Sequence, residues 1–439
     1  MKILILGLLV LLSHNSLANF PETFGSSPNT SGLAGQSSGD VEDPSNAYYF
    51  PSMAVFSRDI NLSASLISVT PSFEPINNIV TLNDLNDETG NSSEETGSAN
   101  TNYDTVNMAI IHATLPLKRT AAISFSGFFP VGLMMETNSG HPFLPEYVMH
   151  RSRYKRTQIY LNFAQRFLHS WALSLGVTMG MQTGGNMDTV MNFSNNDSSI
   201  GSFANSKIKV KPNIGGQISL IRNTRNSQLG FTLVQEIKHN IKLRTFVKTG
   251  DPLPLPNDLL IQSMQYYDPW TFRIGYTRKL SYIDYIANIE AQYWENYKSP
   301  VVRLEVINGN LLPSSNYETI KTRAIIIPKL GVRIHATNDT NIMLGAAYRQ
   351  TPFDGDFSGA GNSIDTDSVI LGTGLNSRWN LFGVNTELSL SAQYQHLMEK
   401  KVVKTAGIES GSSGNKLGSP GYTIGGNILS IGAGIKISL

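Results

Sequence analysis

Few residues of this sequence have the types and spacing that catalysis requires. It contains eight histidines and no cysteine, so thiol chemistry and disulfides are excluded. A serine hydrolase needs a Ser, a His and an orienting group within hydrogen-bonding reach. The histidines, such as His112, His239 and His396, instead stand singly, and no His, Asp and Glu cluster has metal-ligand spacing. We expect no enzyme, no catalytic residues, no metal and no cofactor.

Two glycine-rich stretches are also poor candidates for ligand binding. "GAGNS" (359–363) and "GTGLNS" (372–377) are followed by no helical pattern, so neither predicts a phosphate-binding loop. The formal net charge is only +1, which gives no indication of a nucleic-acid partner.

One stretch indicates an irregular β-strand rather than a catalytic site. "AAISFSGFFPVGLMMET" (121–137) alternates like a β-strand, yet Pro130 lies within it and Gly127 and Gly132 lie close by. Proline cannot donate a ladder hydrogen bond, so we expect the strand to be interrupted there. What the interruption does depends on the kind of sheet. The apolar side chains around it are Phe128, Phe129, Leu133 and Met134.

The first residues indicate export. Met1 and Lys2 precede the apolar run "ILILGLLVLL", and Ser16-Leu17-Ala18 has the small residues of a cleavage site. Ten apolar residues are too few to span a membrane as a helix, which takes about 20. We predict a signal peptide over 1–18 and a mature chain that begins at Asn19.

Alternating strands dominate the remainder. Apolar and polar residues alternate over 171–182, 384–394 and 429–439, and these runs have the length of a tilted membrane-crossing strand. Charged residues make up only 15% of the chain, whereas soluble domains usually carry about a quarter. Short polar turns such as 168–170 also alternate with long loops rich in Asn, Ser and Gly, such as 184–206. Together these features favour an outer-membrane barrel over a soluble β-sandwich or propeller.

We therefore predict an all-β fold, a 14-stranded antiparallel transmembrane β-barrel over 53–439. The even strand number places both ends of the barrel on the periplasmic side. The expected strands lie near 53–71, 105–117, 120–136, 153–166, 171–183, 207–222, 228–243, 258–278, 284–297, 322–336, 340–351, 367–379, 383–397 and 423–438.

Residues 19–52 do not follow this pattern. They are rich in small residues, Gly and Pro, which alone indicates a linker. The lumen of a barrel of this size is too wide for side chains to fill, so it is open or plugged. We expect 19–52 to form a plug, or hatch.

Several segments resemble the outer-membrane long-chain fatty acid transporters, a family that includes aromatic-hydrocarbon channels. "SGLAGQSSGDVEDPSNAYYFPSMAVF" (31–56) looks like the hatch of this family, and "FPVGLMMET" (129–137) looks like its third-strand element. The hairpin 268–297 and the strand-to-loop element "AAYRQTPFDGDF" (346–357) are similar as well. The resemblance implies passive uptake of a hydrophobic ligand by a monomer that contacts outer-membrane lipid and lipopolysaccharide.

The resemblance also implies roles for individual residues. A hydrophobic ligand would leave sideways, through a gap in the barrel wall, rather than cross the aqueous periplasm. The implied sites are the lateral exit at Gly127, Phe128, Phe129, Pro130, Gly132 and Leu133; the hatch residues Tyr49, Phe50 and Pro51; and an anionic-group anchor at Arg323. Independently of the resemblance, the long loop 245–262 carries apolar residues that indicate a surface for catching hydrophobic molecules: Leu253, Leu255, Leu259 and Leu260.

Alternatives stay open at each of these sites. The interruption at Pro130 is otherwise an ordinary β-bulge that adjusts curvature. The leucines of 245–262 can instead pack within their own loop, and the aromatic residues of 48–50 can simply pack on the wall. For the whole protein the alternative is a general diffusion porin or a structural surface barrel.

Overall fold

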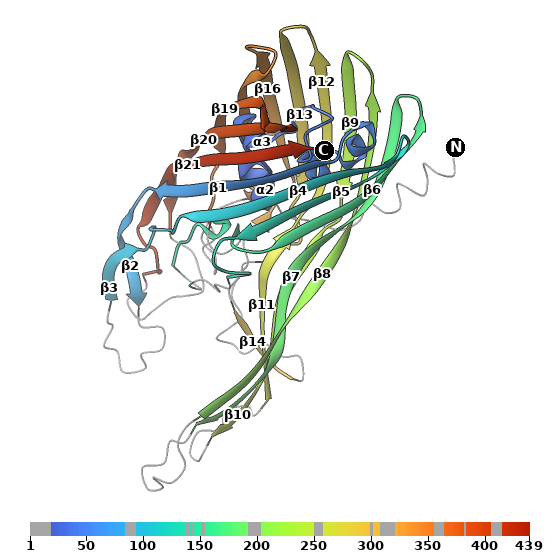
Figure 1. Cartoon of the computed structure of the whole chain (residues 1–439). Helices are drawn as coiled ribbons and strands as arrows, with labels where there is room; N and C mark the ends of the chain where they lie inside the picture. Colours follow the sequence, from blue (N-terminus) through green and yellow to red (C-terminus); the bar gives the residue numbers. More distant parts are fainter. Residues whose placement is uncertain are drawn as a thin grey trace, which may run out of the picture.

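The chain forms a closed β-barrel with a long β-extension at one end (Figure 1). This computed structural model describes residues 19–83, 94–136, 141, 144–150, 154–191, 203–249, 258–298, 302–307, 321–354, 364–381, 383–404 and 415–439. The predicted signal peptide therefore lies outside the described residues.

Fourteen antiparallel wall strands are found within these ranges, as predicted, and two of them are broken into two pieces each. The unbroken strands are β1 (Asn61–Phe73), β4 (Val106–Lys118), β5 (Ala121–Pro130), β6 (Gln158–Leu168), β7 (Trp171–Met191), β8 (Phe203–Asn223), β13 (Ile283–Tyr293), β16 (Ile325–His335), β17 (Thr340–Arg349), β19 (Ser368–Leu381), β20 (Val384–Val403) and β21 (Gly421–Ser438). The broken strands are β9 (Ser227–Val234) with β10 (Ile237–Thr249), and β11 (Asp258–Asp268) with β12 (Trp270–Lys279).

Pairing of the first strand with the last closes the ring. β1 pairs with β4 on one edge and with β21 on the other, from Asn61 opposite Ser438 to Phe73 opposite Gly426. Alternation sorts the side chains by face: Leu388 and Leu390 are exposed on the outside, whereas Ser389 and Ser391 are buried inside. Closure pairs the first strand with the last, so that neither is left as an open sheet edge.

The connections divide the barrel into two ends. Turns of a few residues join β4 to β5, β6 to β7, β12 to β13 and β16 to β17, and both Asn61 and Leu439 lie at that same end. Longer connections leave the other end and contain the short strands β2 (Ile76–Asn83), β3 (Glu94–Ala99), β14 (Arg303–Val306), β15 (Lys321–Thr322) and β18 (Phe353–Asp354). This asymmetry is the one expected from the sequence.

Several strand boundaries differ from the prediction. The first strand begins at Asn61 instead of residue 53, because Pro51–Phe56 forms the 3₁₀ helix η1. β5 ends at Pro130 rather than near 136. β7 and β8 continue well beyond their expected ends and, with β10, β11 and β14, build the extension seen at the bottom of Figure 1.

Residues 19–56 lie inside the barrel. They form the short helices α2 (Phe20–Phe24), α3 (Pro28–Gly32) and α4 (Asn46–Tyr49), followed by η1, and nearly all of their residues are buried. α3 contacts β17, β19, β20 and β21, while η1 contacts β4 through β8. None of the helices in the described part of the chain has the length and hydropathy needed to cross a membrane.

Opposed glycines in the wall make room for this N-terminal segment. Gly345 lies between Gly331 and Gly372 in the strand pairing, and a Cβ on Gly345 would stand 2.2 Å from the backbone carbon of Leu33. Gly230 and Gly275 face each other in the same way, and a Cβ on Gly275 would stand 2.5 Å from the Phe50 ring. Glycine within a strand often marks such a close approach.

Candidate functional site

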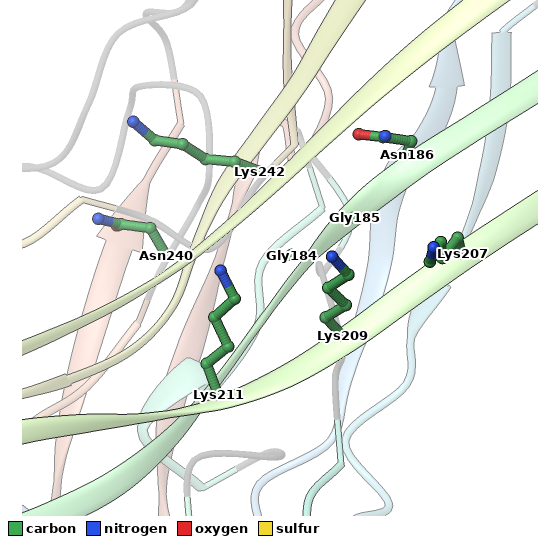
Figure 2. Close-up of a pocket in the computed structure, with 8 residues that line it drawn as sticks. All are labelled: Gly184, Gly185, Asn186, Lys207, Lys209, Lys211, Asn240 and Lys242. Carbon is green, nitrogen blue, oxygen red and sulfur yellow. The ribbon is translucent and has the colours of Figure 1, made fainter.

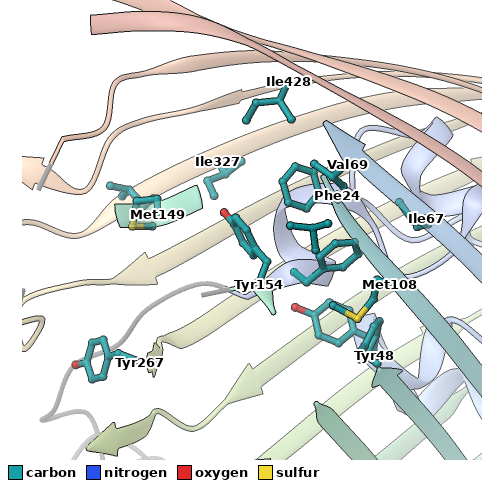
Figure 3. Close-up of a cluster of buried hydrophobic side chains, with 14 of the residues drawn as sticks. Phe24, Tyr48, Ile67, Val69, Met108, Met149, Tyr154, Tyr267, Ile327 and Ile428 are labelled. Carbon is teal, nitrogen blue, oxygen red and sulfur yellow. The ribbon is translucent and has the colours of Figure 1, made fainter. Parts of the chain in front are cut away.

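Two segments contribute buried side chains to one cluster inside the barrel, and Tyr154 lies where they meet. The first is the N-terminal segment; the second is the connection between β5 and β6, which contains η2 (Val148–His150) and contributes buried Tyr147, Met149 and Tyr154. The Tyr154 ring lies 5.0 Å from that of Phe24 in the first insert and 5.8 Å from that of His150 in the second. Figure 3 shows Phe24, Tyr48 and Tyr154 among wall side chains such as Met108 and Ile327.

The aromatic residues of α4 pack directly behind β5. The Tyr48 ring lies 5.8 Å from Phe128 on β5 and 5.1 Å from Tyr160 on β6. Phe128 itself is fully buried. Aromatic pairs at these separations stabilise packing beyond their buried area, so the N-terminal segment braces the wall at the place where the sequence predicts a break.

Ion pairs hold the N-terminal segment from two sides. On one side, Glu22 accepts from Nη2 of Arg273 at 3.1 Å, and Arg273 also donates to Glu290 at 3.0 Å. Nη2 of Arg273 additionally donates to the Tyr48 hydroxyl at 2.7 Å. All of these groups are buried. Removal of one partner from a buried ion pair is costly, because it leaves a charge uncompensated.

On the other side Asp40 contacts two wall arginines. Its carboxylate lies 3.0 Å from Arg378 and 3.6 Å from Arg333. Arg378 and Lys436 in turn share Glu387, at 3.1 and 2.9 Å. Burial alone raises the pKa of Asp40, but the charges of Arg333, Lys436 and Arg378 outweigh it and hold this pKa well below its usual range.

The wall is interrupted between β5 and β6. Their pairing ends where Phe128 faces Gln158, and it resumes where the amide of Thr157 donates to the Met134 carbonyl at 2.9 Å. Residues 129–133 therefore face no residue of β6. On the β4 side the contact persists, since Pro130 faces Met108. The predicted interruption at Pro130 is thus present and is confined to one edge of β5.

Around this interruption the exposed surface is apolar. Val131, Leu133 and Met134 are exposed, and Gly132 turns the chain with a φ of +85°. A Cβ on Gly127 would stand 2.6 Å from the Phe129 ring, so a side chain there would require that ring to move. Of the predicted exit residues, Phe128 thus faces the lumen and Leu133 the outside.

Arg156, which no sequence motif marks, lies at the inner side of this interruption. Its guanidinium is 1% exposed, pairs with Asp268 and lies 5.0 Å from the Tyr266 ring centroid. Its Nε and Nη1 nevertheless have no hydrogen-bond partner among the described residues. A buried cation with unfilled donors is suited to an anionic or polar group. Its only sequence signal was a basic residue just before an alternating strand.

The other predicted residues lie in several places. Tyr49 and Phe50 are buried, the Tyr49 hydroxyl donates to the Pro21 carbonyl at 3.3 Å, and Pro51 begins η1. Arg323 is exposed and precedes β16, so it lies apart from the lumen cluster. Leu259 and Leu260 are half-buried in β11 rather than in a loop, while Leu253 and Leu255 lie outside the described residues.

Two buried histidines, His112 and His239, contact polar groups of the barrel and of the N-terminal segment. Both ring nitrogens of His112 are occupied, by the Ser126 hydroxyl at 2.7 Å and the Ser26 carbonyl at 2.6 Å. His239 contacts Asp268 at 3.4 Å. In the part of the chain that the structure describes, no three His, Cys, Asp or Glu residues form a metal-binding group. The described lumen residues provide apolar packing and ion pairs.

Comparison with solved structures identifies the fold. A FadL homologue from Pseudomonas aeruginosa is 13% identical, with a TM-score of 0.60 over 97% of this chain and 99% of that one. The CymD monoaromatic hydrocarbon channel is 12% identical (TM-score 0.52; 95% and 98%), and the Ralstonia pickettii toluene transporter TbuX is 10% identical (TM-score 0.51; 95% and 99%). No family model and no curated protein matches the sequence. The chain has the fold of FadL-type outer-membrane channels.

Proposed function

We propose that this protein lets small hydrophobic molecules, such as long-chain fatty acids, related lipids or hydrocarbons, diffuse across the bacterial outer membrane. The N-terminal segment acts as the hatch, and the ligand leaves sideways into the bilayer at the interruption between β5 and β6. The protein performs no catalysis. The structural neighbours described as channels and transporters of hydrocarbons support this function by their shared fold.

The observation that carries the proposal is where the interruption lies. Residues 129–133 leave the β6 edge at the same place where Tyr48 of the N-terminal segment packs on Phe128. Movement of the segment would uncover an apolar passage between the lumen and the outside. An apolar molecule that takes this route avoids the aqueous periplasm, where its exposed surface costs about 25 cal/mol per Å².

Arg156 adds a place for a polar head group. It lies beside the interruption, within the lumen, and has two unfilled donors. We assign the anionic-group anchor to Arg156 in preference to Arg323, because Arg156 is buried with two unfilled donors whereas Arg323 is exposed.

Deletion of residues 129–133 provides the test, because the pairing on either side of them is in register. Phe128 would then be followed by Met134, and Gln158 is already preceded by Thr157. The shortened β5 would pair with β6 without a break. We expect uptake of a fluorescent long-chain fatty acid and of a radiolabelled aromatic hydrocarbon into proteoliposomes to fall at least about tenfold.

Pro130→Ala is the milder variant, and we expect it to reduce uptake less than the deletion does. Heat-dependent migration in gels verifies that both variants fold as barrels. If the deletion variant takes up both probes at the wild-type rate, the interruption is an ordinary bulge. If the wild-type protein instead gives a steady ion conductance and no selective uptake, it is a porin.

A further inference from the structure

A second site lies in the extension, away from the lumen. A cavity of about 570 Å³ opens between β7, β8 and β10, lined by Lys207, Lys209, Lys211, Lys242, Asn240, Asn186, Gly184 and Gly185. Figure 2 shows Lys209 and Lys211 extending from the same side of β8, and Lys242 on the separate strand β10.

The lysines share a face for a simple reason. Lys207, Lys209 and Lys211 alternate along β8, so their side chains leave one face of the strand about 7 Å apart. Within the barrel this same face carries Gln217 and Ser219, which are buried in the lumen. The opposite face carries the exposed Ile208, Val210 and Ile214. The lumenal face of β8 therefore continues outward as a row of ammonium groups.

The strand pairing brings a fourth lysine to this row. β7 leaves β6 after Gly180 and then pairs with β10, so that Gly184 faces Lys242. On its other edge β7 pairs with β8, where Gly184 faces Lys209. Gly184 shares the face of these lysines and provides no side chain between them, so the floor of the cavity stays open.

None of the four lysines forms an ion pair with a carboxylate among the described residues. Other basic residues of this region are paired, such as Arg244 with Asp258 and Lys238 with Glu236. Asp188, the next acidic residue on this face of β7, does not line the cavity. Four like charges around one cavity repel each other, in a protein whose net charge is only +1. This cost is recovered when an anion binds.

We propose that the lysine cavity binds a ligand that carries two or more phosphate groups. Each phosphate monoester bears a charge of about −1.5 to −2 at pH 7, so two of them balance four ammonium groups. A single carboxylate would leave most of the charge uncompensated. Lysine binds phosphate as a point charge and needs no fixed geometry. The cavity lies at the end of the barrel opposite Asn61 and Ser438, where both soluble polyphosphates and phosphorylated glycolipids of the outer leaflet have access.

The test uses the full chain in nanodiscs and two probes. One is free inorganic tripolyphosphate, measured by titration calorimetry. The other is a bis-phosphorylated glycolipid in vesicles, compared with its mono-phosphorylated form. The variant is Lys209→Gln with Lys211→Gln, and Lys242→Gln is made separately. The matched control is Lys400→Gln with Lys401→Gln, two exposed lysines on β20.

We expect the wild type to bind at least one probe, more weakly as salt is raised. The Lys209/Lys211 variant should lose at least about tenfold in affinity, and the Lys400/Lys401 variant should bind normally. Binding of tripolyphosphate alone assigns the site to a soluble ligand, and binding of the vesicles alone assigns it to a lipid. The proposal is overturned if the wild type binds neither probe at millimolar concentration, or if both double variants behave alike. Hydrophobic uptake is expected to be unchanged by these variants, so this result is independent of the proposed function.

Discussion

At the residue scale, the opposed glycines explain how a wide barrel holds its N-terminal segment. Gly345 and Gly372 let the backbone of residues 31–34 approach the wall more closely than any side chain would permit. The segment is thus positioned by the absence of Cβ atoms as much as by its ion pairs. The sequence shows these glycines within alternating strands, but only the register reveals that they face one another.

Gly345→Val is expected to displace the N-terminal segment. The new side chain would collide with the Leu33 backbone, and overpacking of this kind typically costs about 1–3 kcal/mol. Because the chain has no native cysteine, Ser31→Cys provides a buried reporter thiol. Labelling of that thiol should accelerate roughly fivefold to a hundredfold.

Gly216→Val is the control for this experiment, because Gly216 faces away from the lumen and its Cβ would contact only the flexible Gln235 side chain. Equal labelling rates in the two valine variants would show that the glycine row is not what admits the segment.

Asp40 makes the docking of the segment sensitive to acid. Its pKa in the folded protein lies below the ordinary value of 3.8, so the docked state binds fewer protons than the undocked state. The stabilisation from Asp40 is therefore complete above about pH 4 and is lost as the pH falls through the lowered pKa. We expect the Ser31→Cys thiol to become accessible below pH 4.

Asp40→Asn should remove this acid response and weaken docking at pH 7 by about 1.5–3 kcal/mol, the worth of hydrogen bonds to a charged group. Arg378 and Arg333 keep Glu387 and Asp284, which limits the loss. An Asp40→Asn variant with the wild-type acid profile would assign the response to other carboxylates.

At the element scale, the strands were more predictable than their ends. Alternation placed all fourteen wall strands, because each has one apolar and one polar face. The exceptions have local causes. Residues 53–56 are apolar enough to resemble a strand but follow Pro51 into a 3₁₀ helix. Pro269 separates β11 from β12, because it cannot donate to the ladder.

The inserts were less predictable than the wall. The composition of 19–52 distinguished that segment from the wall strands, but nothing indicated that Tyr147, Met149 and Tyr154 of the connection between β5 and β6 would be buried. Arg156 was overlooked for the same reason, since its partner Asp268 lies far away in the sequence. Long-range pairs of this kind are set by the register of the closed ring and leave no local pattern.

At the scale of the whole molecule, the barrel wall is expected to fold without the N-terminal segment inside it. Closure rests on pairing between β1 and β21, which involves no residue of the N-terminal segment. Deletion of residues 19–56 should therefore leave a barrel with heat-dependent gel migration and open a path for ions. Planar-bilayer recordings should show a conductance well above that of the wild type.

The β5–β6 insert stays in the lumen of that variant, so its conductance should remain below that of an open porin of similar size. A deletion variant that no longer folds would show instead that the segment is part of the barrel core.

The pairing of β1 with β21 also constrains the order of steps in barrel assembly. The N-terminal segment emerges first during synthesis, yet several of the surfaces it docks on, β17, β19, β20 and β21, are made last. The segment must remain uncommitted until the final hairpin arrives, and the ring then closes around it. Residues 19–56 can therefore dock completely only when β17 to β21 have formed and the β1–β21 pairing closes the barrel around them.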